Sequence, residues 1–308
     1  MPVDEKKSQR REDSVESKLK RFSILKAEAN TVREKDKILI RSLFQNFYQK
    51  QLTVGIGFQR AYGSILAGDY FDLVKLPENK YMFVFADVSG HGLPAYTTLI
   101  RLRSAITLAV KDMVRIHATT GLLDTRLLVK DISTKFTDIM DEANSDDFAC
   151  VNFTIIDKDD GRFRLRFYNR SMLFPIVIRH GEDGSIHIFN LNQSREDWDP
   201  QKGYLLGSDL RKLLGDTYLD TPVCEFTIYE GDSIFFYSDG IIEAYNHEKG
   251  PDEFGDNRLE NVLRDNAGLF PQIVVDELFR KVYEFIGKPE YQKDDMTAVL
   301  INFPSPGE

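Results

Sequence analysis

The chain has 308 residues, enough for one large domain or for a domain with an appendage. Its formal net charge is −9 at pH 7. A nucleic-acid-binding protein needs a basic face for phosphate contacts, so this charge disfavours that class of partner. No apolar run approaches the roughly 20 residues that cross a bilayer. The charged N-terminus also lacks the apolar core of a signal peptide. We therefore expect a cytoplasmic protein without a membrane span.

The two cysteines, Cys150 and Cys224, both fall in segments that we expect to be strands. Cysteine is among the most often buried residue types, so free thiols are favoured over a disulfide. Free thiols fit a reducing compartment.

Residues 1–50 differ in character from the rest, and we expect them to form a separate unit before a domain at residues 51–308. Residues 1–13 are almost wholly polar, as disordered segments are. Between residues 14 and 50, apolar side chains recur at spacings near three and four without Gly or Pro, which predicts an amphipathic helix. Such an apolar stripe needs a partner surface. It either packs on its own domain or pairs with another chain, and the second alternative predicts a homodimer through this N-terminal helix.

From Leu52 onward, strand-like segments dominate the chain. Tyr70–Leu76 and Lys80–Val88 predict a hairpin closed by a Pro-Glu-Asn turn. The second of these strands is apolar nearly throughout, which is typical of a central strand buried on both faces. Val151–Asp157 and Arg162–Asn169 predict a second hairpin.

The remaining segments complete an α+β pattern. Further strands are expected at Pro175–Ile178, Ile186–Phe189, Val223–Tyr229, Ser233–Tyr237 and Met296–Phe303, and helices at Leu93–Val114, Leu122–Met140, Arg258–Asp265 and Pro271–Ile286. Antiparallel hairpins with helices grouped in pairs favour a layered sandwich over a doubly wound sheet.

Acidic residues stand beside four of the apolar runs. Asp87 ends the expected central strand, and Asp239 follows another strand directly before a glycine. Asp69 precedes a strand, and Asp294 and Asp295 precede the last one. Clustered carboxylates raise each other's pKa unless a cation lies between them. Because oxygen-only ligand sets suit Mg²⁺ or Mn²⁺, the sequence predicts a two-metal hydrolytic site.

Four short segments then carry a family resemblance. They are Ala-Gly-Asp-Tyr-Phe-Asp at 67–72, Asp-Val-Ser-Gly-His-Gly at 87–92, Tyr-Ser-Asp-Gly-Ile-Ile-Glu-Ala at 237–244 and Asp-Asp-Met-Thr at 294–297. In this order they resemble the metal-dependent protein phosphatases of type 2C, in their bacterial SpoIIE/RsbU-type branch. The resemblance runs from about Leu52 to Phe303 and leaves residues 1–50 outside. It implies a layered α-β-β-α sandwich of two antiparallel sheets flanked by helix pairs.

The resemblance also implies a site for two ions, Mn²⁺ or Mg²⁺. The positions that match metal ligands are Asp69, Asp87, Val88 through its carbonyl, Asp239 and Asp294. Asp87 corresponds to the ligand that bridges both ions, and catalysis is expected to depend most on Asp87 and Asp239. Either Asp294 or its neighbour Asp295 coordinates, and the match favours Asp294.

Other residues of the matched segments have less certain roles. His91 could protonate a leaving alkoxide near neutral pH, but packing within the turn is favoured because its register differs from that of the wider family's histidine. Asp72 and Glu243 are expected to be structural. Asn169–Pro175 departs from the branch's usual Asn-Ala-Gly-His-x-Pro-Pro, which predicts altered regulation or loop packing rather than lost catalysis.

We therefore expect a protein serine/threonine phosphatase that acts on a phosphorylated signalling protein. The resembled branch often acts on anti-sigma-factor antagonists. One alternative is a pseudophosphatase scaffold that binds phosphoproteins without turnover, but a scaffold has no need to keep repelling acids together. A second alternative is a metal-dependent phosphodiesterase that acts on nucleotides.

Overall fold

The computed structural model describes residues 53–159, 162–181, 183–246, 248, 250 and 252–303. All of them belong to one compact unit, Arg41–Glu308. The helix expected within residues 14–50, and the homodimer expected through it, lie outside the described residues.

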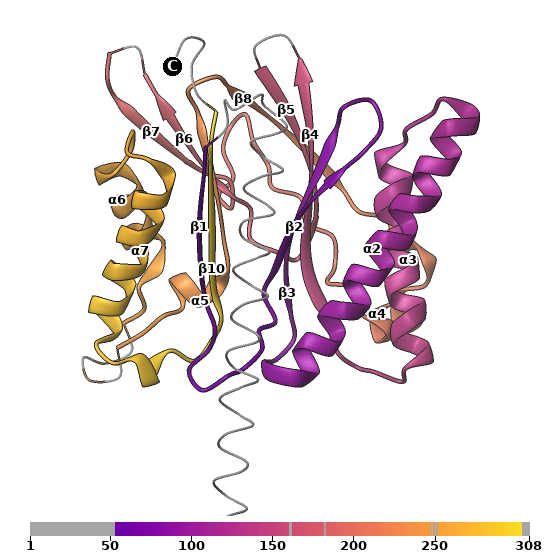
Figure 1. Cartoon of the computed structure of the whole chain (residues 1–308), viewed down its shortest axis with the longest axis horizontal. Helices are drawn as coiled ribbons and strands as arrows, with labels where there is room; N and C mark the ends of the chain where they lie inside the picture. The colour runs from indigo at the N-terminus through magenta and orange to yellow at the C-terminus, as the bar shows by residue number, and fades with distance from the viewer. Residues whose placement is uncertain are drawn as a thin grey trace, which may run out of the picture. The chain divides into compact units, whose positions relative to one another are not determined.

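Two antiparallel sheets of five strands each form the middle of this unit (Figure 1). The first sheet has the order β1-β10-β9-β6-β7. Its strands are β1 (Thr53–Gln59), β10 (Met296–Asn302), β9 (Ser233–Tyr237), β6 (Ile176–His180) and β7 (Ile186–Asn190). The second sheet has the order β2-β3-β4-β5-β8. Its strands are β2 (Tyr70–Lys75), β3 (Tyr81–Val88), β4 (Ala149–Asp159), β5 (Arg162–Arg170) and β8 (Val223–Tyr229).

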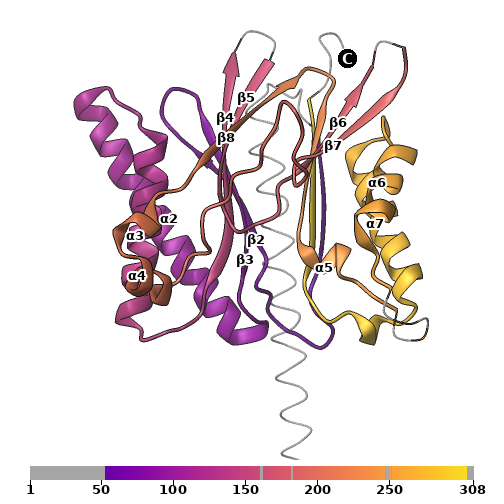
Figure 2. The same cartoon turned by 180° about the vertical axis from the view of Figure 1, so that it is seen from behind.

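Helix pairs cover the outer faces of the two sheets, as Figures 1 and 2 show from opposite sides. Helices α2 (Gly92–Thr120) and α3 (Thr125–Glu142) share an apolar core with the second sheet. Helices α6 (Gly255–Asp265) and α7 (Pro271–Ile286) share another with the first sheet. The described chain is therefore an α+β sandwich, which confirms the predicted layered fold.

Strand β3 shows how the layers are specified. It lies between β2 and β4, and its residues from Met82 to Ala86 are buried. Met82, Val84 and Ala86 belong to the core shared with α2 and α3. Phe83 and Phe85 point the other way, and the Phe83 ring lies 4.6 Å from the Phe236 ring of β9. Because side chains alternate along a strand, Asp87 lies on the same inner face as Phe85, at the strand's end.

Two expected helices have different bounds in the structure. The helix predicted at 93–114 extends from Gly92 to Thr120 and ends where Gly121 adopts a left-handed conformation. The helix predicted at 122–140 begins only after Asp124, whose carboxylate accepts hydrogen bonds from the backbone N–H groups of Arg126 and Leu127. The other predicted strands and helices agree with the structure to within a few residues.

The short helices were not predicted from the sequence, because a helix of one or two turns is too short to show a repeating pattern of apolar residues. They are α4 (Ser208–Leu214), α5 (Asp239–Ile242) and the 3₁₀ helices η1 (Asp216–Leu219) and η2 (Pro289–Tyr291). None of the described helices is long and apolar enough to cross a membrane. Both cysteines are free thiols, as predicted.

Asn169–Pro175, the segment that departs from the family pattern, packs against the chain around η1. Arg170 is fully buried and donates hydrogen bonds to the Tyr218 carbonyl at 2.8 Å and to Thr221 Oγ1 at 3.2 Å. Its guanidinium also lies over the Tyr218 ring, 4.7 Å from the centroid. The Asn169 side chain accepts a hydrogen bond from the Met172 backbone N–H. These contacts tie the end of β5 to η1, so this segment has a packing role.

Candidate metal centre

Asp87 lies at the end of β3, on the face that looks toward the first sheet. In the antiparallel register it stands opposite Cys150 at the start of β4. The turn that follows contains two glycines with positive φ, Gly90 and Gly92, the second of which begins α2. A buried strand followed by this turn holds the Asp87 carboxylate in a fixed position at one end of the sandwich.

Asp69 connects the two sheets. It precedes β2 and is 2% exposed. Its carboxylate accepts hydrogen bonds from Ser238 Oγ at 2.8 Å and from Thr297 Oγ1 at 2.5 Å. Ser238 follows β9 and Thr297 lies in β10, so Asp69 bonds to the sheet to which it does not belong.

Asp239 is the first residue of α5, directly after β9 and Ser238. The next residue, Gly240, lies against the chain that enters β10, and a Cβ added there would come within 2.1 Å of the Asp295 carbonyl oxygen. Only glycine permits this approach, which brings Asp239 beside Asp294.

Asp294 and Asp295 differ sharply in their surroundings. Asp295 is 2% exposed and accepts hydrogen bonds from the backbone N–H groups of Ala61 at 2.8 Å and Gly68 at 2.7 Å. Asp294 is exposed, and one of its oxygens accepts a hydrogen bond from the Asp295 N–H. Asp295 therefore holds three segments together, whereas Asp294 retains an oxygen that a ligand could use.

We call Asp69, Asp87, Asp239, Asp294 and Asp295 the carboxylate cluster. Burial, followed by repulsion from Asp239, Asp294, Asp295 and Glu243, raises the pKa of Asp87 to about 8. Burial and then the charges of Asp87 and Asp295 raise the pKa of Asp69 well above its usual value. Burial and then Asp294 raise the pKa of Asp239. The five acids, which come from four separate segments of the chain, therefore lie close enough for their charges to act on one another.

The donor set fits hard divalent cations. All of these side chains offer oxygen, and a bound cation would relieve both their repulsion and their loss of water. Gly68 also leaves the Val88 carbonyl oxygen uncovered. A Cβ atom added at Gly68 would lie only 2.9 Å from that oxygen. Among the residues that the structure describes, no three Asp, Glu, His or Cys side chains converge tightly enough to hold an ion by themselves. Mg²⁺ sites commonly use one or two carboxylates and complete the shell with water, which is compatible with this spacing.

The other predicted residues lie around the cluster. His91 is exposed and precedes α2 without capping it through its side chain. The Asp72 carboxylate accepts hydrogen bonds from the Tyr70 hydroxyl and the Leu73 N–H, as a structural role requires. Glu243 was expected to be structural, but burial and then repulsion from Asp239, Glu253 and Asp294 raise the pKa of its carboxyl. The charges of the cluster thus act on Glu243. In the sequence, its position four residues after Asp239 was the feature that could have indicated this.

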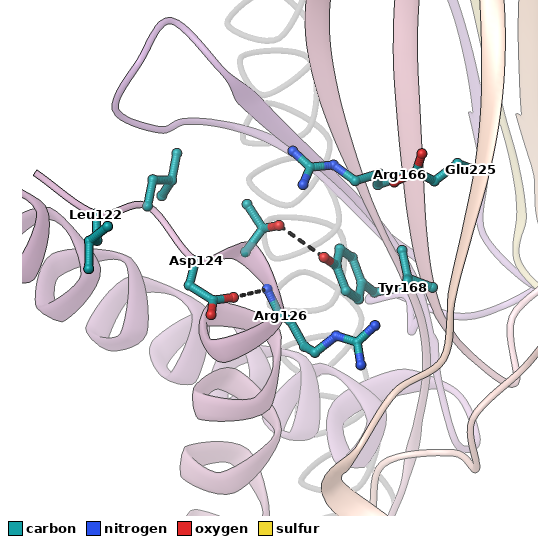
Figure 3. A pocket seen from close by; sticks show the side chains of 9 residues that line it. Leu122, Asp124, Arg126, Arg166, Tyr168 and Glu225 are labelled. Atoms are coloured by element: carbon teal, nitrogen blue, oxygen red, sulfur yellow. Dashed lines mark hydrogen bonds between the residues drawn. The ribbon is translucent and has the colours of Figure 1, made fainter.

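One cavity of the described residues lies elsewhere. It has a volume of about 500 Å³ and is lined by residues of the α2–α3 connection, the start of α3, β5 and β8 (Figure 3). Tyr168, whose hydroxyl lies 2.9 Å from Thr125 Oγ1, points toward the helices. Phe167 and Asn169 lie on the opposite face of β5. The cavity is therefore on the other side of the second sheet from Asp87.

The contrast between Asp294 and Asp295 leads to a prediction for Ala substitutions. Asp295→Ala leaves two buried N–H groups without an acceptor, so we expect the folded state to lose about 2–4 kcal/mol. Asp294→Ala removes an exposed side chain and should change the metal-free melting temperature little. If Asp294 is the ligand, its variant should instead need more Mn²⁺. Thermal melts in chelator and manganese titrations measure the two effects, and the reverse pattern would show that Asp295 coordinates.

The raised pKa of Asp87 predicts a pH-dependent stability of the metal-free protein. The carboxyl has a pKa of about 3.9 when unfolded and of about 8 in the folded chain. The folded state therefore binds the extra proton, and the stabilisation is complete below about pH 4 and lost as the pH rises through about 8. We expect the melting temperature in EDTA to fall over this range, and to fall less for Asp87→Asn. Equal slopes for the two proteins would contradict the assignment.

Comparison with known proteins places this geometry in a family. The Stage II sporulation protein E (SpoIIE) family matches residues 77–304. The SiaA-PP2C domain of Pseudomonas aeruginosa has a TM-score of 0.64 at 16% identity, covering 93% of this chain and 98% of that one. The PP2C phosphatase domain of SpoIIE from Bacillus subtilis, solved with a fragment of its regulatory domain, has a TM-score of 0.57 at 20% identity, covering 82% and 63%. No curated protein matches the sequence. The solved structures share the fold, and the family match spans well over half of the sequence: the chain belongs to the Stage II sporulation protein E (SpoIIE) family.

Proposed function

We propose that this phosphatase hydrolyses phosphoserine or phosphothreonine on a signalling protein, with two Mn²⁺ or Mg²⁺ ions as cofactors. The observation that carries the proposal is the carboxylate cluster. Four separate segments of the chain contribute to it, and burial and mutual repulsion raise the pKa of Asp87 to about 8. A bound cation would offset both the burial and the repulsion, so such an arrangement is typical of a cation site.

The proposed ligands follow from position and availability. Asp87 would be the main ligand of the ions, and the carbonyl of Val88 next to it would contribute a further oxygen. Asp69, Asp239 and Asp294 supply the other protein oxygens. When bound, such ions would supply an activated water for in-line attack on phosphorus and positive charge for the phosphoryl oxygens. The chain's own task is to hold these oxygens at fixed places, which the bonds of Asp69 and the close approach of Gly240 achieve.

The substrate class rests on the family. We propose a phosphorylated regulatory protein, of which an anti-sigma-factor antagonist is one example. The alternative of a phosphoprotein-binding scaffold without turnover is less well supported, since the proposed ligand positions all retain their acids. Hydrolysis of a phosphopeptide but not of a cyclic dinucleotide would separate the proposal from the phosphodiesterase alternative.

Removal of metal gives the first test. Turnover of a phosphopeptide should disappear in EDTA and return with millimolar Mn²⁺ or Mg²⁺, because oxygen ligands hold these ions loosely. Zinc should not replace them. Asp87→Asn and Asp239→Asn should each lower turnover at least a hundredfold at saturating Mn²⁺, while circular dichroism shows a folded domain. Full activity after exhaustive chelation would refute the two-metal proposal.

A further proposal concerns domain organisation. Residues 1–50 would form a regulatory unit before the phosphatase domain at 51–308, and the amphipathic stripe between residues 14 and 50 would mediate homodimerisation. Helix α2 begins five residues after Asp87, so a force on that helix reaches the proposed main ligand through one short turn.

Deleting residues 1–50 tests this organisation. We expect the full chain to be dimeric at tens of micromolar and the truncated chain to be monomeric, because the apolar stripe has been removed. Light scattering measures both masses. The truncated form should also need a different Mn²⁺ concentration for half-maximal activity. A monomeric full chain would refute the dimer, and an unchanged manganese titration would refute its influence on the site.

A further inference from the structure

Lys202 lies in the long connection between β7 and β8, where that connection returns to the second sheet. The Gly203 N–H donates to the Asn169 carbonyl at 2.7 Å, and Leu206 pairs with Ala149, the residue before Cys150. On the other side of Lys202, the Gln201 N–H lies 3.2 Å from Cys224 Sγ. Both neighbours of Lys202 are therefore fixed to the sheet, close to the end at which Asp87 lies.

The side chain of Lys202 is held without a counter-charge. Its ammonium lies 5.7 Å from the centre of the Phe174 ring. It remains exposed, yet the protein around it removes enough water to lower its pKa, an effect that Cys150 partly opposes. No carboxylate within the described ranges forms an ion pair with it. An exposed lysine fixed over an aromatic ring and lacking an acidic partner is poised to bind an anion.

Cys150 relates Lys202 to the carboxylate cluster. It stands opposite Asp87 in the strand register. After burial, Asp87 and Asp239 are the main causes that raise the pKa of its thiol to about 12, whereas Lys202 lowers it. Cys150 thus interacts both with acids of the cluster and with Lys202. The pairing of Leu206 with Ala149 brings the Lys202 segment to the start of β4, on the Cys150 side of the cluster.

Two buried amides lie on the same face of the second sheet as Cys150. The side chains of Asn152 and Asn169 face each other across β4 and β5, and both are completely buried. Within the part of the chain that the structure describes, neither Nδ2 atom has a hydrogen-bond acceptor. Their N–H groups add partial positive charge on the face of the sheet that carries Cys150. Arg60, by contrast, is engaged by the Ile65 carbonyl and by the charge of Asp295.

We propose that Lys202 binds an acidic side chain of the substrate, close in sequence to the phosphorylated serine or threonine. This inference rests on the proposed phosphatase function and deepens it by naming a substrate preference. The phosphoryl group would lie at the carboxylate cluster with its metals. An extended peptide advances about 3.3 Å per residue, so a residue within a few positions of the phosphorylated one can reach an ammonium on the Cys150 side of the cluster. Lys202 thereby becomes a specificity residue rather than a catalytic one.

Kinetics with paired substrates test the proposal. A phosphothreonine peptide series carrying Glu, Gln or Lys at each flanking position, and p-nitrophenyl phosphate, would be assayed with manganese and the full chain. For wild type we expect one Glu position to lower KM. Lys202→Gln should raise KM for that peptide about three- to fivefold, as loss of an exposed ion pair does, with kcat unchanged. Lys202→Glu should invert the preference toward the Lys peptide, and Lys202→Arg should retain the wild-type order.

The controls separate the possible failures. Lys158→Gln removes a lysine that also lies over a phenylalanine, 5.8 Å from the Phe163 ring, but at the far end of β4 from Cys150. It should leave every KM unchanged. The KM for p-nitrophenyl phosphate should not respond to Lys202→Gln, because that substrate has no flanking residue. Equal losses for p-nitrophenyl phosphate and peptides, or no charge preference in wild type, would overturn the role of Lys202. Absence of all phosphatase activity would instead count against the proposed function.

Discussion

Buried carboxylates that stand beside one another cost free energy, and at one end of this sandwich the chain holds several of them. Asp87 cannot lose its proton easily, because it has lost much of its water and faces other acids. In the metal-free protein this charge cluster works against folding at neutral pH. The apolar layers that pack on both sides of β3 and β10 keep the acids in place despite that cost.

The acids of the cluster divide into two groups by their hydrogen bonds. Asp69 and Asp295 bond to neighbouring segments, and these bonds fix the two sheets against each other. Asp87, Asp239 and Asp294 lie closer to solvent, where an oxygen is available to an ion. The bonds of Asp69 and Asp295 thus give the whole cluster a rigid frame, which a two-metal site requires because the attack on phosphorus tolerates little displacement.

The surroundings of the cluster are chemically asymmetric. Acids gather where the two sheets approach each other at Asp69, Ser238 and Thr297. Near Cys150, the connection between β7 and β8 instead offers the ammonium of Lys202. A substrate that carries a phosphoryl group and a nearby acid complements both regions once cations occupy the first. The asymmetry therefore connects the proposed chemistry with the proposed substrate preference.

The sequence by itself determined the layers and the acids, because both depend on local patterns. The alternation in β3, the hairpins and the four acidic segments were all readable without coordinates. The sequence could not distinguish Asp294 from Asp295, because adjacent acids differ only in their tertiary contacts. Here the N–H groups of Ala61 and Gly68 donate hydrogen bonds to Asp295. Lys202 belongs to no sequence motif. It lies 52 positions after Cys150, in the connection between β7 and β8, where the apolar residues show no helix or strand period. Only tertiary structure could bring that ammonium beside Cys150, because the interactions that place it join residues far apart in the chain.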